Sequence, residues 1–156
     1  SISKSSGTFD IPLPIVEWKR LVHGFVEARG YQVLYRGIAT PVDGRATVDI
    51  DAAAGMTPGT FAALTKNAVV QSLQNQDSFA RLRPGPIVGG SFEIVCEDDT
   101  SADRVAWFVV AERNDDYIRN DDPHIDRETG AFIAEYDAPE KPEVAPMPVD
   151  APAQAE

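Results

Sequence analysis

The fold prediction starts from Val105-Ala-Trp-Phe-Val-Val-Ala111, seven consecutive apolar residues in a chain of 156. Successive side chains of a strand point to opposite faces of its sheet, so an uninterrupted apolar strand has no face suited to water. The run therefore predicts a central strand over 104–113 that is covered on both faces. Trp107 and Phe108 point to opposite sides, and one of them is a candidate anchor at an interface. A neighbouring subunit and the segment 11–14 of the same chain are the two candidate covers for the second face.

Four further segments have strand patterns. Residues 91–97 are expected to pair with 104–113 as a hairpin across the acidic loop 98–103. Residues 31–40 and 45–51 are expected to form another hairpin, because Ala46, Val48 and Ile50 alternate with polar residues. Pro41-Val-Asp-Gly44 between them has the chemistry of a tight turn, with Gly44 free to adopt a positive φ. Residues 131–136 are predicted to form one more short strand.

Two segments have the spacing of amphipathic helices. A first helix is predicted between Pro14 and Gly30, because Gly30 is a suitable C-terminal cap and apolar residues recur between them at intervals of three and four. These residues are Trp18, Leu21, Val22, Phe25 and Val26. A second helix is expected to open at Thr57-Pro58, with a hydroxyl cap followed by proline, and to fade near 74–77. Its expected buried stripe runs from Phe61 to Leu73.

Together these elements predict an α+β fold in which two helices pack on a mainly antiparallel sheet, in the order α-β-β-α-β-β-β. We place the single α+β domain at residues 14–137, with an N-terminal arm at 1–13. The C-terminal tail, 138–156, is acidic and rich in proline and alanine, so it buries too little apolar surface to order itself. We expect a neighbouring subunit to hold this tail through its larger apolar residues, Val144, Met147 and Val149.

The charge balance restricts the classes of partner. Fourteen basic and twenty-five acidic residues give a net charge of −11, which disfavours direct binding to nucleic acid or to an anionic membrane surface. No apolar run approaches the ~20 residues that a membrane-spanning helix needs. A single cysteine, Cys96, rules out an internal disulfide and fits a reducing compartment, so the expected location is the cytoplasm on synthesis.

The acidic loop 114–128 is the strongest candidate for a chemical site. Asp121, Asp122, Asp126 and Glu128 offer the oxygen ligands that hard cations such as Ca²⁺ prefer. The spacing departs from the EF-hand loop, because the required glycine is missing and Pro123 interrupts the run. Clustered Asp and Asn residues are also common turn formers, so a solvated turn is the first interpretation and a metal site the alternative.

No catalytic motif is present, and we predict neither catalytic residues nor a cofactor. The glycine-rich stretch 83–91 leads into a strand without the Lys-Ser or Lys-Thr pair of a phosphate-binding loop. The sequence favours a non-enzymatic structural or interaction protein of a homo- or hetero-oligomeric assembly, such as a virion component of a tailed-phage head or tail, with arms that dock on neighbouring subunits. The alternative is a small metal- or ligand-binding module, or an enzyme, that uses the loop 114–128.

Overall fold

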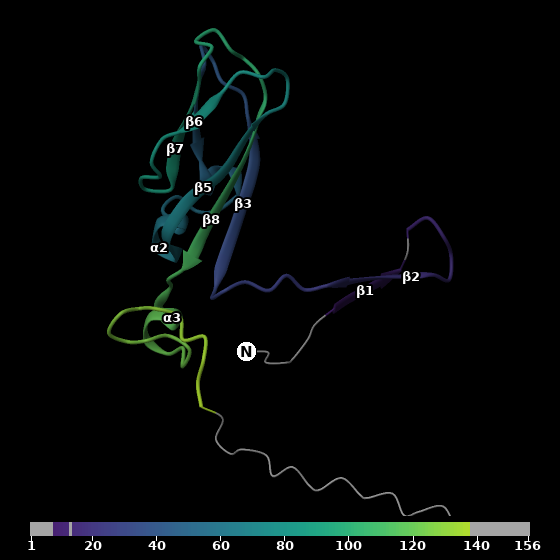
Figure 1. Ribbon diagram of the computed structural model, residues 1–156, viewed down its shortest axis with the longest axis vertical. Coiled ribbons are helices and arrows are strands. Elements are labelled where there is room, and N and C mark those ends of the chain that lie inside the picture. Colours follow the sequence, from purple (N-terminus) through teal and green to yellow (C-terminus); the bar gives the residue numbers. More distant parts are fainter. Residues whose placement is uncertain (1–7, 13, 138–156) are drawn as a thin grey trace, which may run out of the picture.

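The computed structural model describes residues 8–12 and 14–137, which form a mixed α+β chain with mostly antiparallel strands in three small sheets and a few short helices (Figure 1). The prediction of an α+β fold with mainly antiparallel strands is therefore confirmed at this level. The described elements are β1 (Thr8–Pro12), β2 (Arg20–Gly24), β3 (Gln32–Ala39), β4 (Arg45–Asp49), α1 (Ile50–Ala53), α2 (Thr60–Leu64), β5 (Thr65–Asn75), β6 (Leu82–Pro84), β7 (Ser91–Cys96), β8 (Val105–Arg113) and α3 (Asp116–Asn120).

The apolar run forms a central strand, as predicted. β8 lies between β3 and β5 and pairs antiparallel with both, so each of its edges is hydrogen-bonded. Trp107 is opposite Gly37 on one side and Leu73 on the other. Gly37 is required there, because a Cβ at this position would lie 2.5 Å from the Trp107 ring. The indole ring of Trp107 therefore packs directly over the backbone of β3.

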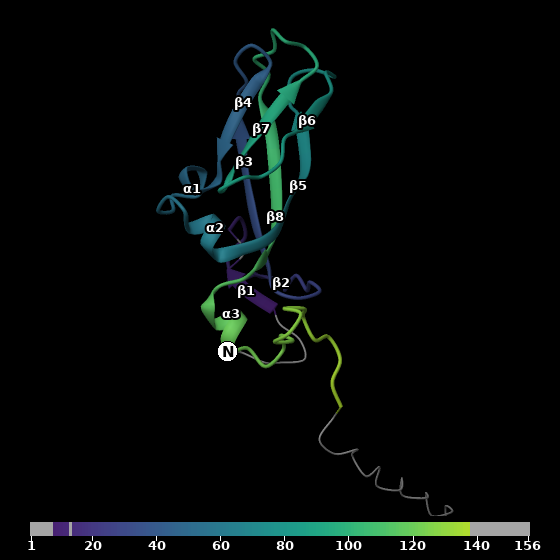
Figure 2. The same cartoon turned by 90° about the vertical axis from the view of Figure 1, so that its left-hand side faces the viewer.

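The second sheet, of order β4-β7-β6, packs against the first and encloses the core. The Phe92 ring of β7 meets Trp107 of β8 edge to face, with ring centroids 5.9 Å apart. The short helices α1 and α2 lie close to one end of the two sheets (Figure 2). They add Ile50 and Phe61 to this core, where both are fully buried. The buried core residues are Val48, Ile50, Phe61, Phe92, Ile94, Val105, Trp107, Val109 and Ala111.

The two predicted hairpins are wrong, although their strands exist. Val42 and Arg45 exchange backbone hydrogen bonds of 2.8 and 3.1 Å across the predicted turn, and Gly44 has a φ of 72°. However, β3 then pairs with β8 while β4 pairs with β7, so this turn connects two sheets. In the same way, β7 and β8 lie in different sheets. Tight-turn residues and alternating strands are common to both arrangements, so the local pattern does not distinguish them.

Both predicted helices are also wrong over most of their length, and with them the predicted order of elements. The first segment contains the strand β2, which pairs antiparallel with β1 of the preceding segment. The second is helical only from Thr60 to Leu64 before it continues as the long strand β5. Spacings of three and four occur by chance where β-branched and apolar residues are frequent, as at Val69 and Val70. Pairing with the edge of β8 decides the conformation of β5, and this partner lies thirty or more residues away in the chain.

Two smaller predictions fail at the end of the domain. Residues 131–136 form no strand and make only an isolated bridge between Ile125 and Phe132. The polar stretch before them contains the short helix α3, with Ile118 buried. Among the described helices, none combines the length and apolar character that crossing a bilayer demands.

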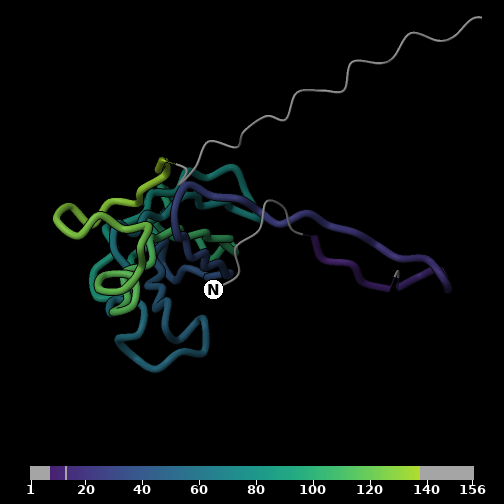
Figure 3. Tube along the Cα trace, turned by 90° about the horizontal axis from the view of Figure 1, so that it is seen from below, coloured from purple at the N-terminus to yellow at the C-terminus, as the bar shows by residue number. Residues whose placement is uncertain are grey.

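The β1–β2 hairpin stands apart from the two packed sheets, on the side where β3 lies (Figures 1 and 3). Its strands make their main contacts with each other, through a register in which Asp10 is opposite Val22. The rings of Phe9 and Phe25 contact each other at a tilt of 59° with centroids 4.7 Å apart, and Arg20 forms an ion pair of 2.8 Å with Asp10. The hairpin is thus held by its own side chains and projects from the domain.

Candidate functional site

The acidic loop folds around its own carboxylates. Oδ1 of Asp122, which is buried, accepts a hydrogen bond of 2.8 Å from the His124 backbone N–H. Oδ1 of Asp126 accepts hydrogen bonds from the backbone N–H and the hydroxyl of Thr129, at 2.7 and 2.8 Å. These bonds hold the pKa of Asp126 below its ordinary value. Asp122 and Asp126 therefore act as turn formers in this loop.

The structure does not gather the four candidate metal ligands. Asp121 is the C-terminal cap of α3 and is exposed, as is Glu128, whereas Asp122 is buried. Within residues 8–12 and 14–137, no three His, Cys, Asp or Glu side chains are placed to share a metal ion. The Ca²⁺ hypothesis remains a prediction: a Ca²⁺ site would raise the melting temperature in a titration, because a ligand that binds only the folded state stabilises it.

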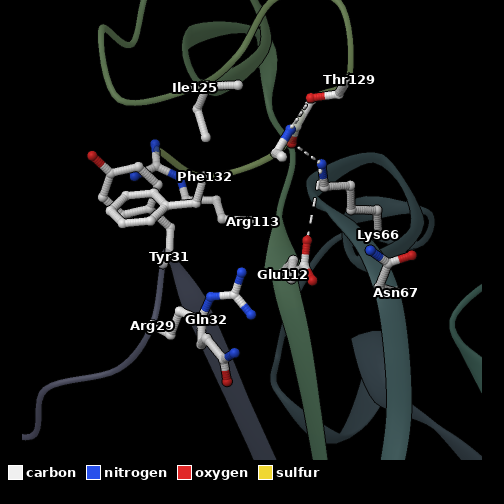
Figure 4. Close-up of a pocket in the computed structure, with 13 residues that line it drawn as sticks. Arg29, Tyr31, Gln32, Lys66, Asn67, Glu112, Arg113, Ile125, Thr129 and Phe132 are labelled. Carbon is white, nitrogen blue, oxygen red and sulfur yellow. Dashed lines mark hydrogen bonds and ion pairs between the residues drawn. The ribbon is translucent and has the colours of Figure 1, made fainter. Parts of the chain in front are cut away.

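A polar pocket of about 380 Å³ lies where the loop 125–132 meets the lower ends of β3, β5 and β8 (Figure 4). The Lys66 ammonium donates a hydrogen bond of 2.7 Å to the Gly130 carbonyl and lies 3.9 Å from the Glu112 carboxylate. Arg113 donates to Asp115 at 2.5 Å. Most charges of this pocket are thus already paired within the protein.

The aromatic residues that line this pocket also contact each other within the protein. Tyr31 and Phe132 meet edge to face with centroids 5.3 Å apart. Burial raises the pKa of Tyr31, and its hydrogen bond with Asp122 raises it further. The pocket therefore ties the acidic loop to the ends of the strands, and we assign no reaction to it.

An apolar surface lies on the outer side of the sheet β3-β8-β5, opposite the core. Leu34 and Val69 flank Val110 across the sheet, and Ile38 lies beside Ala106. Leu34, Val69 and Ile38 remain 58%, 55% and 62% exposed. We call this surface the outer face and define it by Leu34, Ile38, Val69, Ala106, Phe108 and Val110. Arg36, Ser72 and Gln74 lie among these residues on the same face. Exposed apolar side chains grouped within a polar rim mark interaction sites in soluble proteins.

A hollow of about 510 Å³ lies at the end of the outer face nearest β4 and the loop 98–103. It is lined by Arg36, Gly37, Ile38, Ser72, Gln74, Ala106, Trp107 and Phe108. Phe108 is half-buried there, whereas its neighbour Trp107 is in the core. The two rings therefore point to opposite sides of β8, as the sequence predicts.

The second apolar surface is on the hairpin. Trp18 is 99% exposed, at the turn between β1 and β2, and its backbone has a φ of 61°. Val22 of β2 and Val26 just beyond it are also mainly exposed. A two-stranded ribbon alone is only marginally stable in water, so such side chains gain most from a surface that covers them.

Sequence reasoning found one of these surfaces in part and missed the other. The apolar run of β8 predicted a cover on both faces, but the second face remains largely exposed at Leu34, Ile38 and Val69. The candidate cover 11–14 does not supply it, because Ile11 and Pro12 pair with β2 in the hairpin. The hairpin was missed, because Trp18, Val22 and Val26 were assigned to the buried stripe of a helix. Pro12, Pro14 and the frequent β-branched residues were the available signals for extended structure. The predicted partner residues Val144, Met147 and Val149 lie outside the described residues.

Comparison with known proteins adds no relative: no family model, no curated protein and no solved structure matches the chain.

Proposed function

We propose that this protein is a non-enzymatic structural subunit of a larger protein assembly, for example a virion, whose extended arms dock on neighbouring subunits. The observation that carries the proposal is the β1–β2 hairpin, which projects from the domain with Trp18 and Val26 almost fully exposed. Exposing large apolar side chains costs free energy in the isolated chain, and a neighbour that covers them recovers it.

The remainder of the chain is consistent with this role. Most charged groups of the pocket in Figure 4 are engaged in internal contacts, and every fully buried polar side-chain atom of the described residues has a hydrogen-bond partner. Two apolar surfaces, the hairpin and the outer face, are available for contact with other subunits. The net charge of −11 favours protein partners over nucleic acid.

The test is sedimentation of the protein from cells that make its native assembly. We expect the native chain in a fraction much heavier than one chain. A hairpin variant, Trp18→Glu with Val22→Glu, is expected to leave that fraction, because two buried, unpaired charges oppose docking. If the native chain sediments as a free monomer, or if the variant stays in the heavy fraction, the hairpin is not a docking arm.

Deletion of residues 138–156 tests the C-terminal arm separately. We expect the melting temperature of the isolated domain to remain nearly unchanged, since the tail is poor in apolar residues. We expect incorporation into the assembly to weaken. Normal incorporation of the truncated chain would remove the tail from the set of docking arms and leave the hairpin to be tested on its own.

A further inference from the structure

The two uncovered surfaces of this chain match each other in chemistry. The hairpin presents Trp18 with flanking apolar residues. The outer face presents a hollow whose apolar side chains include Ile38, Ala106 and Phe108 and whose polar side chains are Arg36, Ser72 and Gln74, while Leu34 and Val69 lie further along the same face. The hollow, at about 510 Å³, is within the range of ~300–1,000 Å³ typical of pockets that hold a ligand. It therefore has room for the indole ring of a tryptophan.

The charges of the hairpin suit contact with another copy of the same chain. The segment from Thr8 to Gly30 carries three acidic and three basic residues, which are Asp10, Glu17, Glu27, Lys19, Arg20 and Arg29. The whole chain carries a net −11, so two copies repel each other through most of their surfaces. A neutral hairpin can approach an acidic neighbour without this repulsion.

The rims of the two surfaces are complementary as well. Glu17 precedes Trp18 on the hairpin, and Arg36 lies at the edge of the hollow. Neither side chain forms an ion pair with another residue in the described part of the chain. An ion pair between Glu17 of one copy and Arg36 of another would fix the direction in which the hairpin docks.

The hairpin also projects on the side from which the outer face can be reached. In Figure 1 it extends past β3, away from β6 and β7, while its main contacts remain within β1 and β2. Two copies whose outer faces approach each other each direct a hairpin towards the other copy. This arrangement would cover the second face of β8 for both.

We infer that the β1–β2 hairpin of one copy lies on the outer face of a second copy, with Trp18 in the hollow beside Phe108 and Glu17 next to Arg36. The inference rests on the proposed function and names the partner of its hairpin. A large aromatic residue in a pocket is the usual energetic centre of a protein interface.

The first experiment uses the purified full chain alone, in sedimentation velocity over a wide range of concentrations. We expect reversible self-association, and we expect Trp18→Ser to weaken it by at least about tenfold in Kd. The matched control is Phe79→Ser, which removes another fully exposed aromatic side chain, outside both surfaces, and should leave Kd unchanged. An unchanged Kd in Trp18→Ser, or an equal loss in Phe79→Ser, would overturn the inference.

The second experiment places the contact. We would mix two single variants, Glu17→Cys and Arg36→Cys, under mild oxidation and run them on a non-reducing gel. A disulfide dimer is expected from this mixture, because each chain supplies one of the two thiols. Glu17→Cys mixed with Arg83→Cys, an exposed position in the other sheet, should give no dimer. Equal cross-linking in both mixtures would contradict the assigned contact. The native thiol, Cys96, is buried.

The outcomes separate this inference from the proposed function. If the purified chain is monomeric at every concentration while the native chain sediments in a heavy fraction, the partner is a different protein and only the inference fails. If the hairpin variant, Trp18→Glu with Val22→Glu, also stays in that heavy fraction, the proposed role of the hairpin fails as well.

Discussion

The domain and the hairpin use similar side chains with opposite results. Trp107 in β8 is 4% exposed, whereas Trp18 in the hairpin is 99% exposed. Phe92 packs between two sheets, whereas the aromatic partner of Phe9 is Phe25 just beyond β2, within the same projecting segment. The difference lies in the number of layers, because a sandwich offers a second sheet and a two-stranded ribbon does not. Apolar composition therefore indicates a need for burial, and the partner that provides it depends on the surrounding structure.

The largest expected effect is in the core. Trp107→Ala should reduce the free energy of unfolding by about 3–5 kcal/mol, since it empties a site packed by Phe92 and the backbone of Gly37. Trp18→Ala should change it by less than about 0.5 kcal/mol at concentrations where the chain is monomeric. Urea denaturation followed by circular dichroism measures both values. Similar losses in the two variants would show that the hairpin packs on its own domain.

A buried carboxylate provides the next test. Asp51 is buried and accepts hydrogen bonds of 2.7 Å from the backbone N–H groups of Gly59 and Phe61. Asp51→Ala should cost about 3 kcal/mol, because it leaves these donors without a partner beside the core. Asp10→Ala breaks the exposed ion pair with Arg20 in the hairpin and should cost at most about 1 kcal/mol. Equal losses in chemical denaturation would contradict this difference.

Two glycines allow a smaller comparison. Gly37→Ala places a methyl group against the Trp107 ring and should destabilise the protein by about 1–3 kcal/mol. Gly24→Ala, at the end of β2, meets nothing within 4 Å and should be close to neutral. Differential scanning calorimetry of the two variants measures the contrast. A neutral Gly37→Ala would mean that the indole ring moves aside at little cost.

The smallest expected effect is on how the melting temperature depends on pH in acid. Arg104 forms a side-chain hydrogen bond and a backbone hydrogen bond to Asp77, which lower the pKa of Asp77 from 3.8 to about 2. A carboxyl group with a lowered pKa stabilises the fold above its ordinary pKa, and this contribution is lost as the pH falls towards about 2. The melting temperature of Asp77→Asn should therefore fall less than that of the native chain between about pH 4 and pH 2. Parallel curves for the two proteins would contradict this assignment.

Sequence reasoning located strands better than it located their partners. β3, β4, β7 and β8 are present within a residue or two of their predicted bounds. The alternation of apolar and polar residues and the apolar run of β8 are local properties of the sequence, so they predict where a strand lies. The pairing of β3 with β8 and of β4 with β7 depends on contacts between distant residues, so neither hairpin prediction could succeed from the turn between the strands.

The candidate site was less predictable still. The acidic residues of the loop 114–128 favoured a cation site as one interpretation. In the structure, however, Asp122 and Asp126 accept hydrogen bonds from their own loop. The apolar residues around Trp18 fit a helix in the sequence, whereas they lie exposed in and around a hairpin. Whether an apolar side chain is buried or left free for a partner depends on what packs over it, and no spacing rule contains that information.

The sequence alone determined the central position of β8, the apolar character of both its faces and the acidity of the chain, because each depends on residue type and two-residue alternation. The tertiary structure decided which strands lie on either side of β8, where the two sheets meet and which apolar side chains remain uncovered. The physical reason is that strand pairing and burial are interactions between residues far apart in the chain, and these determine whether Trp107 or Trp18 is shielded from water.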